Sequence, residues 1–116
     1  PATLAFLYKD SALITIEGIV PKLLGNIHFF VWDPKILENE IVDVGRAIVQ
    51  DVMERYDLHR ISAFPPAFNK LALRVAVRCG FKYEGTIRQT FLQNGIYHDV
   101  MAYGLLRHEF RERGAR

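Results

Sequence analysis

The fold of this chain is decided by residues 68–85, which read Phe68-Asn69-Lys70-Leu71-Ala72-Leu73-Arg74-Val75-Ala76-Val77-Arg78-Cys79-Gly80-Phe81-Lys82-Tyr83-Glu84-Gly85. Asn69 predicts the start of an amphipathic helix, because an Asn side chain accepts a hydrogen bond from an orphan amide of the first helical turn. Gly80 predicts the end of that helix, since glycine readily adopts the left-handed conformation that stops it. The segment that follows, from Tyr83, is expected to begin a strand.

The residues before this segment predict three strands, a long helix and a fourth strand. The strands are expected at 3–8, 12–20 and 23–32, separated by turn signals at Lys9-Asp10-Ser11 and Pro21-Lys22. Apolar residues then recur every three or four positions over 39–56, which predicts one buried helix face formed by Ile41, Val44, Ile48 and Val52. A short apolar strand, 60–64, ends at Pro65-Pro66.

Two strands complete the chain, at about Tyr83 to Gln93 and Ile96 to Leu106. Asn94-Gly95 lies between them, and this pair is the strongest short hairpin signal. The predicted order is three strands, helix, strand, helix and two strands, which is an α/β fold with a mixed sheet.

Composition excludes several classes of protein. A length of 116 residues corresponds to one domain, and a net charge of +2 is too small to indicate a nucleic-acid partner. No apolar run is long enough to cross a bilayer, so no membrane partner is expected. Cys79 is the only cysteine, which rules out an intrachain disulfide and favours a reducing, cytoplasmic compartment.

The two ends of the chain carry less structural signal. The domain is expected to span 1–106, and the basic segment 107–116, with its interleaved acids, is expected to fray as a tail. The start at Pro1, almost directly in a strand pattern, indicates a processed or truncated protein.

The element order and one motif together resemble a known family. The motif is Asn69…Gly80-Phe81…Glu84-Gly85, preceded by His59-Arg60-Ile61 and followed by Gly95-Ile96-Tyr97-His98-Asp99-Val100. It resembles the C-terminal half of a GNAT (Gcn5-related) N-acetyltransferase, closest to the branch that acetylates ribosomal-protein N-termini at alanine. The resemblance covers nearly the whole chain. It implies a β-β-β-α-β-α-β-β sheet with splayed central parallel strands, without the family's first strand and first two helices.

The resemblance also implies a cofactor and a reaction. Acetyl-CoA would lie where strands 23–32 and 60–64 splay apart, held by the backbone of Phe30, Val31 and Trp32 and by Asn69. Its acetyl group would pass to a primary amine, either a protein N-terminus or a small molecule. No metal is expected, because the four histidines have no ligand-like spacing with carboxylates or with Cys79.

Two features depart from the family pattern. The pyrophosphate loop should fall at 37–43, but this segment has no glycine and contains the acids Glu38, Glu40 and Asp43, which would repel phosphate. A structural explanation is that these acids face the positive end of a helix dipole and that Asn39 caps the helix. In GNAT proteins a hydroxyl at one of two positions in this helix usually gives a proton to the leaving thiolate. In this sequence those two positions are Ala72 and Ala76, which have no hydroxyl.

The remaining catalytic candidates are few. Glu17 and His28 are candidates for the general base, and Tyr83 is a candidate for the acid, although each is also an ordinary strand residue. His98 and Asp99 are adjacent in a strand, so alternation places their side chains on opposite faces and prevents them from forming a base–orienter pair.

Three hypotheses about function therefore remain open. The chain is an active N-acetyltransferase, a degenerate GNAT domain that serves as a structural module in a homo-oligomer or larger assembly, or an enzyme whose first ~50 residues are missing. Because of the acidic loop, weak or absent binding of acetyl-CoA is expected.

Overall fold

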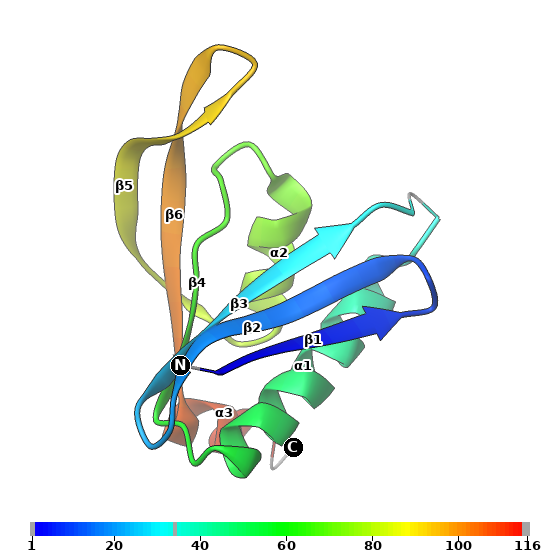
Figure 1. Cartoon of the computed structure of the whole chain (residues 1–116), viewed down its shortest axis with the longest axis vertical. Helices are drawn as coiled ribbons and strands as arrows, with labels where there is room; N and C mark the ends of the chain where they lie inside the picture. Colours follow the sequence, from blue (N-terminus) through cyan, green and yellow to red (C-terminus); the bar gives the residue numbers. More distant parts are fainter. Residues whose placement is uncertain (1, 34, 115–116) are drawn as a thin grey trace.

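The computed structural model describes residues 2–33 and 35–114, which form one sheet and three helices (Figure 1). The elements in chain order are β1 (Ala2–Tyr8), β2 (Ala12–Val20), β3 (Leu24–Val31), α1 (Glu38–Arg55), β4 (Arg60–Ala63), α2 (Lys70–Arg78), β5 (Lys82–Gln93), β6 (Ile96–Leu106) and α3 (Arg107–Gly114). The predicted order of strands and helices up to β6 is confirmed.

The sheet is mixed, as predicted. Its six strands have the order β1-β2-β3-β4-β6-β5, and only the β3–β4 pair is parallel. The β5–β6 hairpin projects beyond the other strands (Figure 1). Asn94 and Gly95 at its tip both have positive φ, 52° and 74°, as a two-residue type I′ turn requires.

The parallel strands β3 and β4 diverge, which confirms the expected splay. They pair over four residues, from Leu24–Arg60 to Ile27–Ala63, and β3 then continues to Val31 without β4 beside it. Strand β4 is paired with β6 from Arg60 to Ala63, and the chain after it continues along β6, where the amide of Met101 donates to the carbonyl of Pro65 at 2.9 Å. The two strands therefore separate at the end where the cofactor was expected.

The predicted apolar face of α1 is part of the core. Ile41, Ile48 and Val52 are buried, and Val44 is half-buried against the same cluster. Helix α1 lies behind β1 and β2 in Figure 1, and α2 lies behind β3, so these two helices cover one face of the sheet. Burial of this apolar surface is the main stabilising term for the packing of helix on sheet.

Helix α2 begins as the sequence predicts. The Asn69 side-chain oxygen accepts a hydrogen bond from the amide of Ala72 at 3.1 Å, which is the expected N-cap. The helix ends at Arg78 with Cys79 as its C-cap, and Gly80, the next residue, has a φ of 101°.

The predicted cap of α1 is wrong. The helix begins at Glu38 after Leu37, and Asn39 lies inside the first turn, where its oxygen accepts a hydrogen bond from Arg78 at 2.5 Å. Glu40 reaches back toward the amide of Leu37 at 3.5 Å. The Asn39 side chain therefore binds a residue of α2 and does not cap α1.

Residues 107–114, which were expected to fray as part of a tail, form α3 in the structure. Phe110 is buried in the main core, and the guanidinium of Arg46 lies 5.3 Å from the centre of its ring. The amide of Arg107 donates to the carbonyl of His59 at 2.9 Å. The charge pattern suggested solvent exposure, but one aromatic anchor holds this segment on the domain; residues 115 and 116 lie outside the described part.

Candidate active site between the splayed strands

A cavity of about 450 Å³ lies where β3 and β4 diverge. Its wall is formed by four parts of the chain: strand β3, the segment after β4, helix α2 and the C-terminal end of β5. The lining residues share an apolar character and include the phenylalanines Phe29, Phe30, Phe64, Phe68, Phe81 and Phe91. The cavity is large enough for a small organic ligand.

The four residues expected to bind the cofactor are divided by the structure. Phe30 and Asn69 line the main cavity, and Val31 lines a smaller neighbouring pocket of about 80 Å³ that Asn69 also lines. Trp32 lines neither of these two pockets, and its indole nitrogen donates to the carbonyl of Asp10 at 3.0 Å. The structure thus places Phe30 and Asn69 at the main cavity, and cofactor binding by the four residues stays a prediction.

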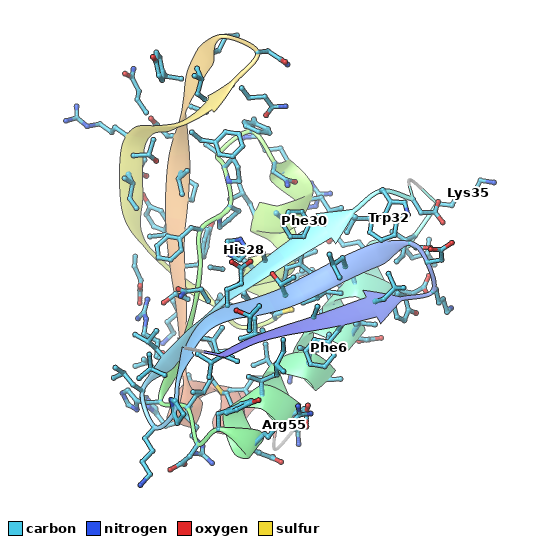
Figure 2. The ribbon with its side chains drawn as sticks, viewed as in Figure 1. Phe6, His28, Phe30, Trp32, Lys35 and Arg55 are labelled. Atoms are coloured by element: carbon cyan, nitrogen blue, oxygen red, sulfur yellow. The ribbon has the colours of Figure 1, made fainter. Side chains whose placement is uncertain are left out.

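Two of the three catalytic candidates are neighbours. His28 lines the cavity, and its Nε2 lies 3.8 Å from the Glu17 carboxylate, which also accepts a hydrogen bond from the Thr15 hydroxyl at 2.8 Å. Figure 2 shows His28 and Phe30 on β3, and their rings are stacked with centroids 6.3 Å apart. An imidazole at the cavity with a carboxylate behind it is an arrangement suited to general-base catalysis.

The third candidate lies elsewhere. Tyr83 is not among the residues that line the cavity; its hydroxyl lies 2.5 Å from that of Thr86, and its ring packs edge-on against Tyr103. His98 and Asp99 have separate partners, since His98 packs on Phe68 while Asp99 accepts from the amide of Gln89. The structure therefore brings only Glu17 and His28 together.

Comparison with known proteins identifies the architecture. No protein-family model matches the sequence. The chain is 30% identical over 81 residues to a Bacillus subtilis (strain 168) protein named "Putative ribosomal N-acetyltransferase YdaF", covering 68% of this chain and 44% of that relative.

Solved structures share the fold over most of the chain. Spermidine N-acetyltransferase SpeG (F149A mutant) from Vibrio cholerae superposes with a TM-score of 0.82 at 16% identity, covering 97% of this chain and 69% of that one. RimL, a ribosomal L7/L12 alpha-N-protein acetyltransferase in complex with coenzyme A, gives 0.75 at 23% identity, covering 83% and 55%. This chain has the GNAT acetyltransferase fold. It spans less than half of the curated relative, and its elements follow the GNAT order from the family's second strand onward.

The two positions where GNAT proteins usually carry a proton donor face the cavity here as alanines. Ala72 and Ala76 both line it, so neither supplies a hydroxyl. Among the described lining residues, the side chains with hydrogen-bonding capacity are His28, Asn69, Cys79 and Gln93. The thiol of Cys79 is buried and lies 3.6 Å from the carbonyl of Val42.

The acids at the start of α1, where a GNAT pyrophosphate loop would lie, have partners. Arg74 contacts Glu38 at 2.8 Å and Arg78 contacts it at 3.0 Å, and these hydrogen bonds hold the pKa of Glu38 below its ordinary value. Glu40 accepts from the Tyr8 hydroxyl at 2.7 Å and pairs with Lys9, and both contacts lower its pKa in the same way. The phosphate repulsion expected from Glu38 and Glu40 assumed unpaired carboxylates, so it is smaller than the sequence indicated.

Three aromatic residues of the site were not predicted from the sequence. Phe64, Phe68 and Phe91 line the cavity, but the sequence offered only an apolar strand end, a residue before a helix cap and a strand residue. The one available signal was the concentration of phenylalanine, at eight residues in 116.

Residues 2–33 and 35–114 lack two kinds of feature. No group of three or more His, Cys, Asp or Glu side chains among them is arranged to hold a metal ion. None of their helices is long and apolar enough to cross a membrane.

Proposed function

We propose that this chain binds acetyl-CoA between β3 and β4 and transfers the acetyl group to a primary amine. The observation that carries this proposal is the splay, because β3 runs on past its last pair with β4 beside a cavity of about 450 Å³. The relatives support the reaction class, since those named above are N-acetyltransferases and one was solved with coenzyme A.

The residues of this chain would divide the work as follows. The backbone of Phe29 to Val31 and the side chain of Asn69 would hold the pantetheine arm, which can hydrogen-bond to strand backbone as an added strand does. Acetyl-CoA supplies the activated acetyl group. His28 would accept a proton from the attacking amine, directly or through one water, and Glu17 would orient the imidazole. As the new C–N bond forms, the acetyl C–S bond would break and coenzyme A would leave as the thiolate, which would take its proton from water or from the His28 imidazolium.

Filling the cavity tests the proposal. Ala72→Phe places a ring in the cavity from α2, whereas Val77→Phe adds the same ring on an exposed part of the same helix. We expect weak but measurable heat of acetyl-CoA binding for the native chain and for Val77→Phe in isothermal titration, and none for Ala72→Phe. Equal binding by all three proteins would contradict the proposed site.

The alternative of a catalytically inactive module, in a homo-oligomer or larger assembly, has one observation in its favour. Both usual donor positions are alanine and face the cavity. Incubation with radiolabelled acetyl-CoA and a mixture of amines separates the two functions. Binding without any transfer of label would favour the module, and label in an amine product would favour the enzyme.

A further inference from the structure

One wall of the cavity is aromatic and belongs to neither of the elements assigned to the cofactor. The Phe68 ring belongs to this wall, and its centroid lies 5.7 Å from that of Phe91 and 4.7 Å from that of His98, both in edge-to-face geometry. Phe64 lines the same cavity from the segment after β4, and Gln93 lines it from the end of β5. We call Phe64, Phe68 and Phe91 the aromatic wall.

The chemistry of this wall favours an apolar ligand. Phenyl rings offer a large apolar surface and favour edge-to-face or offset contact with another ring. Among the residues described as lining the cavity, none is Asp, Glu, Lys or Arg. The face of a phenyl ring can stabilise one ammonium group, but the further ammonium groups of a polyamine would lose hydration without gaining a carboxylate partner. The carboxylate of Glu17 lies beside His28 and already accepts a hydrogen bond from Thr15.

We infer that the aromatic wall binds an apolar group attached to the acceptor amine. The acceptor is then a monoamine with an apolar or aromatic substituent beside the reacting nitrogen, and not a polyamine. This inference rests on the proposed acetyl transfer and names its acceptor class. It also separates this chain from SpeG, which has the same fold and is named for spermidine.

Equilibrium binding of two probes to the full chain tests the inference. The probes are 2-phenylethylamine, an aromatic monoamine, and spermidine, a polycation, each titrated with and without coenzyme A. We expect 2-phenylethylamine to bind more tightly, and Phe91→Ala to weaken it about tenfold or more through lost pocket contacts. Leu92→Ala is the matched control, because Leu92 is the next residue of β5, is 60% exposed and is not among the cavity-lining residues.

A gain of function gives an independent test. Gln93→Glu introduces a carboxylate at the cavity, and we expect it to raise the affinity for spermidine relative to 2-phenylethylamine by about tenfold. Thr90→Glu places the same charge on an exposed residue of β5 that does not line the cavity, and we expect that ratio to stay unchanged.

The outcomes distinguish this inference from the proposed function. Tighter binding of spermidine than of 2-phenylethylamine by the native chain, or equal effects of Phe91→Ala and Leu92→Ala, overturns the inference even if acetyl transfer occurs. Binding of 2-phenylethylamine that depends on Phe91, in a chain that neither binds nor consumes acetyl-CoA, supports the aromatic subsite and overturns the proposed transfer.

Discussion

At the scale of single residues, Asn69 has a structural role in α2 and also lies at the proposed cofactor site. Its side-chain oxygen caps α2 through the amide of Ala72, and the residue lines both pockets. Loss of such a cap costs about 1 kcal/mol of stability. An effect of an Asn69 substitution on cofactor binding therefore has to be separated from its effect on the helix, which Asn69→Ser does by retaining a capping oxygen.

His28 is the residue whose substitution tests the chemistry most directly. We expect His28→Gln to lower kcat for acetyl transfer by about 10²–10⁴-fold, because the cavity loses its proposed proton acceptor. The acetyl-CoA dissociation constant should change little, since Asn69 and the β3 backbone remain. Steady-state kinetics and titration give the two quantities.

His59→Gln is the matched control for that experiment. His59 is exposed, precedes β4 and is not among the residues that line the cavity. A similar loss of kcat in both variants would contradict the role of His28.

At the scale of elements, a salt bridge crosses one strand to join two others. Arg60 on β4 and Glu84 on β5 lie on either side of β6, and Arg60 Nη1 is 2.8 Å from Glu84 Oε2. The pair passes over Gly104 of β6, where a Cβ would lie 2.5 Å from Arg60 Nη2. Glu84 sits in a register shift between Tyr83 and Gly85, and such bulges re-aim a side chain.

This bridge predicts a pH-dependent contribution to stability. The Arg60 guanidinium lowers the pKa of Glu84 below its ordinary value of 4.5, so the contribution is present at neutral pH and is lost as the pH falls through the lowered pKa. Since the Glu84 side chain is 39% exposed, we expect Glu84→Gln to cost no more than about 1 kcal/mol at pH 7 and nothing in strong acid. Urea unfolding across this pH range measures the difference.

Gly104→Ala provides the control for the crossing. The new methyl group should displace the pair, so adding Glu84→Gln to that variant should have no further effect. Additive losses in the double variant would show that the pair does not depend on the space above Gly104.

At the scale of the whole molecule, stability and site depend on the same core. Helices α1 and α2 cover one face of the sheet, and α3 adds Phe110 to the cluster. The splay is possible because β4 is held by β6 where it leaves β3, through bonds such as that from Met101 to Pro65. The open cavity is therefore a product of the sheet topology.

The core predicts the effect of truncating α1. Ile48 is 8% exposed, and we expect Ile48→Ala to lower the free energy of unfolding by about 2–4 kcal/mol through lost burial and a residual cavity. Gln50→Ala, on the exposed side of the same helix, should change it by no more than about 0.5 kcal/mol. Chemical denaturation of both variants measures this, and equal effects would show that the Ile48 face does not stabilise the fold.

The local features of this protein were determined by its sequence. The Asn69 cap, the apolar face of α1 and the turn at Asn94-Gly95 each depend on a few residues close together in the chain, where capping, periodicity and positive φ operate. The strand order and the splay followed from the family resemblance that these features supported.

The tertiary structure alone decided which side chains meet. Arg74 and Arg78 bind Glu38 from 36 and 40 residues away, and their positive charges offset the carboxylate that the sequence indicated would repel phosphate. Tyr83 and Trp32 were left off the cavity, and Phe91 was brought to it from the far end of a hairpin. Such contacts depend on strand register and on the angle between elements, and both are set by packing of the whole core.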